Sequence, residues 1–138
     1  MKLCIIDSGF LYALIDDSDQ YAQHVREAAE SIFEPILLPS PAITETAYFV
    51  QRNLGQAALA RFVGSLNIMG MSIIDPVEPD MNRAAEILQA YPDQDIDFVD
   101  AMIVAMAERL DVTKILTIDR RHFSIFRPAH CESFEILP

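Results

Sequence analysis

The sequence predicts a three-layer α/β fold in which a central, mostly parallel five-stranded sheet is flanked by helices. Two observations predict this class. Short, nearly continuous apolar segments alternate with longer segments whose apolar residues recur every three or four positions. Short turns join the segments, as is typical of strands and helices that alternate around a parallel sheet. With 138 residues and no repeat, linker or low-complexity tract, the chain is expected to form one domain over residues 1–138.

The predicted strands are short segments rich in Ile and Leu, most of which stop at Asp or Pro. They lack a clean alternation of polar and apolar residues, which indicates strands buried on both faces, as in a parallel sheet. In chain order they are Lys2–Ile6, Pro35–Leu38, Met71–Ile74, Lys114–Ile118 and Phe134–Leu137.

Helical spacing fills the segments between these strands. Asp17, Ser18 and Asp19 are candidate caps for the second helix. Pro79 suits the first turn of the fifth. The predicted helices are Ser8–Ile15, Asp19 or Gln20 to Ile32, Ile43–Asn53, Gln56–Leu66, Pro79–Ala90 and Asp97–Leu110.

Composition excludes several classes of protein. An apolar share of 51% with 22% charged residues is ordinary for a soluble globular protein. No apolar stretch of about 18 residues is present, so no membrane span is expected. The Leu3–Ile15 segment is interrupted by Asp7 and has no cleavage site, which argues against a signal peptide. Cys4 and Cys131 form no disulfide framework or CxxC pair, and the expected compartment is the cytoplasm.

The net charge argues against a nucleic-acid partner. Ten basic residues against 21 acidic ones give −11, whereas nucleic-acid binders usually carry a basic surface. Metal-binding carboxylates are neutralised by their own cations, so the formal charge overstates the field at such a site. Half of the basic residues also lie in the last 30 positions: Arg109, Lys114, Arg120, Arg121 and Arg127.

Four acidic residues fall where the chain leaves the carboxyl edge of the predicted sheet. Asp7 follows the first strand, and Asp119 follows the fourth. Glu45 lies near the start of the helix after the second strand, and Asp100 lies in the first turn of the last helix. Ligands bind at this edge in open parallel sheets, so the four side chains are expected to converge. Each has a plainer interpretation as a strand end, a turn or a helix-terminal acid, and Asp97 with Asp100 fits a capping pair.

Converging carboxylates predict a metal site. They repel one another unless a cation compensates them, and oxygen ligands without Cys or His favour Mg²⁺ or Mn²⁺. Two such ions can activate water and stabilise the leaving oxygen of a phosphodiester. His24, His122 and His130 show no metal-ligand spacing and are not expected to take part.

At these motifs the chain resembles the PIN-domain family, and within it the ribonuclease toxins of VapBC toxin–antitoxin systems. The opening IIDSGFLYALID is similar to the family's first motif with Asp7 as its acid, and PAITETAYFV is similar to the second with Glu45. The segment DFVDAMIVAMAERLDVTKILTIDRRHF matches most closely, with Asp100 and Asp119 at the third and fourth acidic positions.

The resemblance implies a Rossmann-like fold and endonucleolytic cleavage of RNA that depends on Mg²⁺ or Mn²⁺. It also implies a homodimer and a small antitoxin that covers the acidic pocket. Asp7, Glu45, Asp100 and Asp119 would hold the metal, and Glu45 would either ligate it or orient the attacking water. Ser8 and Thr117 occupy small polar positions of the motifs, and Asp97 is an additional candidate ligand. Arg120 and Arg121 are candidates for contacts with the flanking phosphates.

Three other functions remain open at this stage. A phosphatase of the haloacid-dehalogenase type needs an acid two residues after Asp7, where this chain has Gly9. A receiver-like signalling domain needs paired acids after the first strand and a lysine after the fifth, and neither is present. A catalytically silent PIN-like domain would bind RNA or protein without cleaving it.

Overall fold

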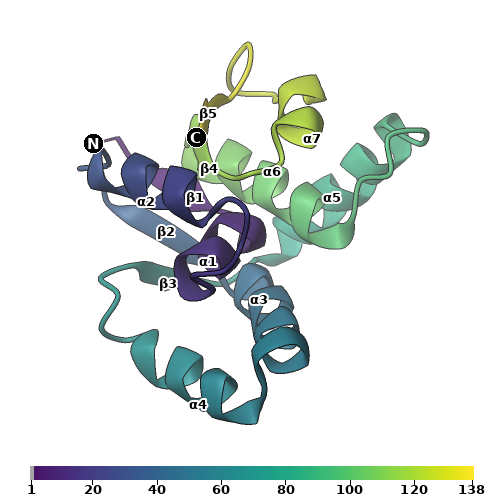
Figure 1. The fold of residues 1–138 in the computed structure, drawn as a ribbon. Helices are drawn as coiled ribbons and strands as arrows, with labels where there is room; N and C mark the ends of the chain where they lie inside the picture. Colours follow the sequence, from purple (N-terminus) through teal and green to yellow (C-terminus); the bar gives the residue numbers. More distant parts are fainter. Residues whose placement is uncertain (1) are drawn as a thin grey trace.

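A parallel sheet of five strands forms the centre of the computed structural model, which describes residues 2–138 (Figure 1). The strands are β1 (Cys4–Ile6), β2 (Ile36–Pro39), β3 (Ser72–Ile74), β4 (Lys114–Leu116) and β5 (Glu135–Leu137). Their order in the sheet is β3-β2-β1-β4-β5, and every neighbouring pair is parallel. This confirms the predicted α/β class.

The helices that connect the strands are α1 (Ser8–Ile15), α2 (Ala22–Glu30), α3 (Ser40–Leu54), α4 (Gln56–Ser65), α5 (Glu78–Ala90), α6 (Phe98–Leu110) and α7 (Arg120–Ile125). The chain runs from β1 outward to β3, then crosses back to β4 and on to β5. Helix α1 packs against α2 and α3, α3 packs against α4, and α5 packs against α6. None of the helices within residues 2–138 is long and apolar enough to cross a membrane.

Most predicted elements are present with boundaries shifted by one to three residues. Helix α3 begins at Ser40 rather than Ile43. Pro41 fits its first turn, because backbone N–H groups there have no partner within the helix and the missing N–H of proline breaks no hydrogen bond. Asp97 is the N-cap of α6, as the sequence predicted.

Two expectations about elements were wrong. Helix α7 was not predicted, because six residues are too few to show a helical period. Strand β3 was expected to be buried on both faces, but Ser72 is exposed and Ile73 is 46% exposed. This difference follows from the position of β3 at the edge of the sheet.

Helix α6 forms the centre of the core. Every residue from Val99 to Ala107 is buried. Fully buried apolar residues of β1 and β4, such as Ile5 and Ile115, belong to the same core cluster. Each Å² of apolar surface removed from water stabilises the fold by about 25 cal/mol. This packing is therefore the main force that fixes the sheet and its carboxyl edge.

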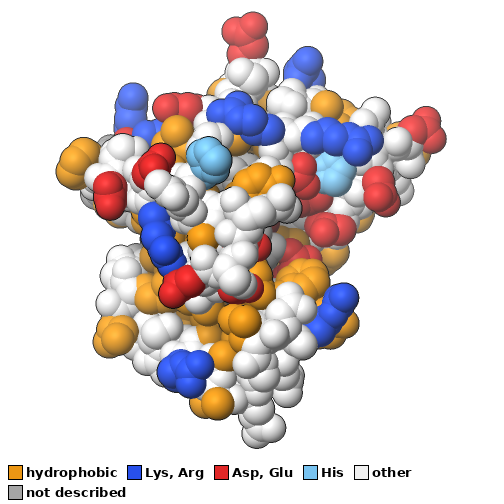
Figure 2. Space-filling view, in the orientation of Figure 1, with side chains coloured by type: hydrophobic (Ala, Val, Ile, Leu, Met, Phe, Trp, Pro, Cys, Tyr) orange, Lys and Arg blue, Asp and Glu red, His pale blue; other side chains and the backbone are white. Residues whose placement is uncertain are grey.

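The surface is mixed in charge. Figure 2 shows acidic and basic side chains interspersed over the upper part of this face, and hydrophobic side chains concentrated below them. Several large apolar side chains are exposed, among them Tyr48 at 61% and Phe98 at 53%. Such a group of exposed apolar residues is typical of an interaction surface.

Candidate metal centre

Asp7 lies between β1 and α1, where the backbone fixes its position. As the N-cap of α1, its Oδ1 accepts a hydrogen bond from the Ser8 backbone N–H at 2.7 Å. Its Oδ2 accepts another from Thr117 Oγ1 at 2.8 Å. The residue is only 5% exposed. Because Thr117 follows β4, the second bond joins the carboxyl ends of two neighbouring strands.

Glu45 approaches the same point from α3. Its Oε1 accepts a hydrogen bond from Ser8 Oγ, which also lies 3.4 Å from Asp7 Oδ1. The neighbouring Thr46 is fully buried, and its Oγ1 lies 3.5 Å from the Ser8 carbonyl oxygen, which holds this turn of α3 against the start of α1. Ser8 therefore connects Asp7 and Glu45.

Asp100 and Asp97 form a reciprocal cap at the start of α6. The Asp100 backbone N–H donates to Asp97 Oδ1 at 2.9 Å, and the Asp97 N–H donates to Asp100 Oδ2 at 3.3 Å. The predicted capping pair is thus confirmed. Asp100 is 5% exposed, while Asp97 is exposed. The cap orients the buried carboxylate of Asp100 toward the carboxyl edge of the sheet.

Asp119 is the N-cap of α7. Its Oδ1 accepts from the His122 backbone N–H at 3.0 Å, and its own N–H donates to Thr117 Oγ1 at 2.9 Å. Thr117 thus contacts two of the four predicted acids, and its hydroxyl fixes the distance between the segments that carry them.

These residues line one cavity of about 300 Å³. Its lining consists of Asp7, Ser8, Gly9, Glu45, Asp97, Asp100, Ile118 and Asp119. Four acids from distant parts of the chain therefore lie together, as their positions after strands predicted. The placement of Asp100, which depended on the path of the loop before α6, agrees with the prediction.

His122 also belongs to this group, which the sequence analysis did not expect. Its Nδ1 lies 2.8 Å from Asp119 Oδ2 and 3.4 Å from Asp100 Oδ2. One ligand atom from each of the three residues lies within 4.8 Å of the other two. Residues three apart share a helix face, so Asp119-x-x-His122 is a ligand spacing once α7 is known to be a helix.

The two arginines lie outside the cavity. Arg120 Nε donates to the Pro138 carbonyl oxygen at 3.0 Å, and its Nη2 donates to the Ile136 carbonyl oxygen at 3.0 Å. Its guanidinium therefore joins the start of α7 to the end of the chain. Arg121 is exposed. Contacts between these arginines and substrate phosphates stay a prediction.

Burial and mutual repulsion disfavour the charged forms of these acids. Burial raises the pKa of Asp7 to about 6, against the hydrogen bonds from Thr117 and Ser8, and the nearby Glu45 and Asp97 add to the rise. Burial, followed by the charges of Asp97 and Asp7, raises the pKa of Asp100 to about 8. Burial also raises the pKa of Glu45.

The residues present fit a divalent cation. A cation beside these carboxylates would offset both their burial and their repulsion. The carboxylates of Asp7, Glu45, Asp100 and Asp119 line the cavity, and carboxylate oxygens are the hard donors that such ions prefer. Among the described residues, Asp100 and Asp119 lie close enough to share one ion with His122, and Asp7 and Glu45 are not part of that group of three. Within residues 2–138, no lysine or arginine lines this cavity to neutralise it.

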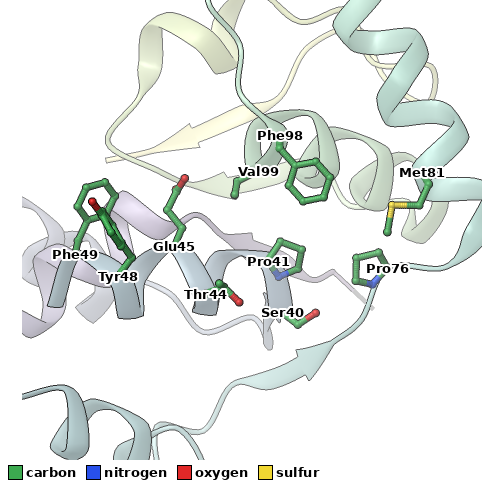
Figure 3. Close-up of a pocket in the computed structure, with 10 residues that line it drawn as sticks. All are labelled: Ser40, Pro41, Thr44, Glu45, Tyr48, Phe49, Pro76, Met81, Phe98 and Val99. Carbon is green, nitrogen blue, oxygen red and sulfur yellow. The ribbon is translucent and has the colours of Figure 1, made fainter. Parts of the chain in front are cut away.

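A second, larger cavity lies beside the acidic one and shares Glu45 with it. Its volume is about 690 Å³. Figure 3 shows Tyr48 and Phe49 at one end, Pro76 and Met81 at the other, and Glu45 between the aromatic pair and Val99. The wall is mainly apolar, and it includes the exposed side chains of Tyr48 and Phe98.

Comparison with known proteins decides the family. The family model for the PIN domain matches residues 4–127. The chain belongs to the PIN-domain family. Its match extends from the start of β1 to the residue after Phe126, and it includes every acid of the cavity. The phosphatase and receiver interpretations are thereby excluded.

Individual proteins are also similar to this chain. Ribonuclease VapC26 of Mycobacterium tuberculosis (strain ATCC 25618 / H37Rv) is 30% identical over 134 residues, which cover 97% of this chain and 99% of that protein. A crystal structure of Mycobacterium tuberculosis VapC20, described as a sarcin–ricin loop cleaving toxin, has a TM-score of 0.75 at 17% identity over 81% of this chain and 86% of that one. A toxin–antitoxin complex from Klebsiella pneumoniae has a TM-score of 0.70 at 16% identity, over 98% of this PIN-domain chain and 96% of the matched chain.

Proposed function

We propose that this PIN-domain protein is an endoribonuclease that hydrolyses RNA phosphodiester bonds with Mg²⁺ or Mn²⁺. The observation that carries the proposal is the convergence of Asp7, Glu45, Asp100 and Asp119 on one cavity at the carboxyl edge of the sheet. The ribonuclease named among its relatives, alike over nearly its whole length, supports RNA as the substrate.

In this proposal Asp7, Asp100 and Asp119 hold the metal, with Asp97 as an additional candidate. A divalent cation supplies Lewis-acid polarisation of phosphate oxygens and makes water more acidic. The Ser8 and Thr117 hydroxyls fix the carboxylates of Glu45 and Asp7 by hydrogen bonds.

In this proposal Glu45 acts on the attacking water. Ser8 Oγ donates to its Oε1, which leaves Oε2 to accept a proton. Burial raises the pKa of Glu45, which makes the carboxylate a stronger base. As the water oxygen bonds to phosphorus, its proton passes to Glu45 Oε2. The bond from phosphorus to one ribose oxygen breaks, and that oxygen takes up a proton from solvent to leave as a hydroxyl.

The test is cleavage of a mixed RNA pool by the wild type and by Asp7→Asn and Asp100→Asn variants, with Mn²⁺, Mg²⁺ or chelator. Both substitutions remove a charge and keep the size of the side chain. Loss of a metal-binding carboxylate should lower the cleavage rate by at least about 100-fold. Asp93→Asn is the matched control, because Asp93 is an exposed loop residue outside the cavity.

Cleavage that requires the metal, is lost in both site variants and survives in Asp93→Asn would support the proposal. Full activity in the site variants would refute the assignment of these residues. Metal binding without cleavage of any RNA would favour the catalytically silent alternative, in which the PIN domain only binds RNA or protein.

We also propose a small antitoxin and a second copy of the chain as partners. The solved neighbours include toxin–antitoxin complexes, among them the one from Klebsiella pneumoniae. Exposed Tyr48 and Phe98 border the apolar cavity next to Glu45, a surface suited to a protein partner. The two free cysteines suit the reducing cytoplasm, which is the compartment that we propose.

We infer a single domain over residues 1–138, since strands from both ends of the chain share one sheet.

A further inference from the structure

The His122 imidazole lies against two of the proposed metal ligands. Its backbone N–H donates to Asp119 Oδ1 at 3.0 Å, so the cap of α7 also sets the start of the side chain. The side chain is 17% exposed, and the next residue, Phe123, is fully buried and anchors the helix. As a result Nδ1 faces the second oxygen of Asp119, 2.8 Å away.

This nitrogen atom is buried but has no hydrogen-bond partner. Nδ1 is among the two buried side-chain polar atoms without a partner that are found in residues 2–138. The oxygens of Asp119 and Asp100 are close to it, yet neither is aligned with a ring N–H bond. An imidazolium ion pair would direct an N–H at a carboxylate oxygen. The observed arrangement instead leaves a nitrogen beside two carboxylate oxygens without a hydrogen bond to either.

Such separations are those of neighbouring ligands around one ion. Bonds of about 2.1 Å at right angles place adjacent ligand atoms about 3 Å apart. The Nδ1 separations of 2.8 Å and 3.4 Å from the two carboxylate oxygens lie near this value. A cation bound there would give the nitrogen a partner and relieve the repulsion that raises the pKa of Asp100.

We propose that His122 supplies, through Nδ1, a nitrogen ligand to a divalent cation held by Asp100 and Asp119. This inference rests on the proposed function, because it concerns the same metal. A nitrogen ligand among carboxylates favours first-row transition-metal ions, Mn²⁺ among them, over Mg²⁺, which prefers oxygen ligands. His122 therefore makes this site selective for Mn²⁺ over Mg²⁺.

The experiment is pulsed electron paramagnetic resonance of the full chain loaded with Mn²⁺, with natural-abundance and ¹⁵N-labelled histidine. A directly bound imidazole produces nitrogen modulation that changes with the label. His122→Asn should remove this modulation, and His24→Asn should keep it, because His24 is exposed on α2. Calorimetry with each metal alone should give His122→Asn at least about tenfold weaker Mn²⁺ binding and a smaller change for Mg²⁺.

The wild-type spectrum decides the matter even if His122→Asn does not fold. Bound Mn²⁺ without imidazole modulation would overturn the inference and leave the proposed nuclease function standing. Modulation that persists in a folded His122→Asn protein would assign the nitrogen to another histidine and also overturn it. If the wild type bound no Mn²⁺ at all, the proposed function would fail together with the inference.

Discussion

Asp7 and Asp100 are buried carboxyl groups whose charge is costly without a cation. Burial is the largest cause in both cases, and it raises their pKa values to about 6 and about 8 from an ordinary value of 3.8. The folded, metal-free chain therefore binds more protons at these sites than the unfolded chain does across this range of pH. Folding stability and metal binding are coupled through the same two groups.

The sign of this coupling gives a prediction for the metal-free protein. Stability from the protonated carboxyls is complete below the unfolded pKa of 3.8 and is lost as the pH rises through the folded values of about 6 and about 8. In chelator, the unfolding temperature of the wild type should fall between about pH 5 and about pH 8. The unfolding temperature of Asp100→Asn, whose side chain stays neutral, should fall less over this range.

Differential scanning calorimetry would measure both effects. Saturating Mn²⁺ should raise the wild-type unfolding temperature most at the alkaline end, where the carboxylates are ionised, and should affect Asp100→Asn little. Asp93→Asn, an exposed loop variant, should follow the wild type throughout. A flat profile for the metal-free wild type would contradict the pKa values on which the prediction depends.

Thr117 offers a second test at the scale of the residue. Its hydroxyl donates to Asp7 Oδ2 at 2.8 Å and accepts from the Asp119 N–H at 2.9 Å. Thr117→Val keeps the shape and removes both bonds, so metal affinity should fall by about 10- to 100-fold, as is usual when partners of metal ligands are lost. Thr113→Val, at an exposed position just before β4, should bind metal like the wild type. Unchanged affinity in Thr117→Val would show that the bond does not position Asp7.

The sequence was informative about the acids and uninformative about the histidine, for a physical reason. Asp7 directly follows β1, Asp119 lies three residues after the end of β4, and parallel strands end at a common edge. Asp100 lies in the first turn of a helix whose apolar period is long enough to recognise. His122 lies on a helix of six residues, and its proximity to Asp119 depends on that helix being formed.

At the scale of elements, α5 and α6 are joined by an ion pair between a buried carboxylate and a partly exposed arginine, separate from the metal site. Asp80 is 2% exposed, and Arg109 contacts both of its carboxylate oxygens at 2.9 to 3.1 Å. Asp80 also accepts from the Val77 backbone N–H at 2.9 Å, which caps α5. The pair therefore fixes the orientation of α5 against α6, the helix that carries Asp100.

Removing Arg109 should be strongly destabilising because the buried carboxylate of Asp80 is left without its charged partner. Arg109→Ala should lower the free energy of unfolding by about 3 kcal/mol, measured by urea denaturation. Asp17→Ala removes an acid from the exposed Asp17–Arg26 pair and should cost less than about 1 kcal/mol. Equal losses in the two variants would argue that burial does not determine the contribution of the Asp80 pair.

Elements differ in how far the sequence could predict them. Helix α6 and strands β1 and β4 were predicted well, because continuous burial gives them an unbroken apolar pattern. Strand β3 kept the composition of a buried strand although it lies at an edge. The strand order, with β1 and β4 adjacent, depends on the connections between elements, so no single segment of the sequence predicts it.

At the scale of the whole molecule, the net charge of −11 must be reconciled with an RNA substrate. Acidic and basic side chains are interspersed on the face in Figure 2, without a continuous basic surface. Four of the ten basic residues are paired with acidic side chains: Arg26, Arg83, Arg109 and Lys114. We therefore expect bound divalent metal to supply much of the attraction to phosphates.

This balance predicts an unusual dependence of RNA binding on ions. In chelator, binding of a fluorescent phosphorothioate RNA should be weak, and Mn²⁺ should strengthen it far more than monovalent salt of equal ionic strength does. With Mn²⁺ present, the slope of log affinity against log salt should be shallower than about −2, because few lysines or arginines displace counterions. Asp100→Asn should bind weakly with or without Mn²⁺. Tight, steeply salt-dependent binding in chelator would reveal a basic surface, and RNA recognition would then not depend on the metal centre.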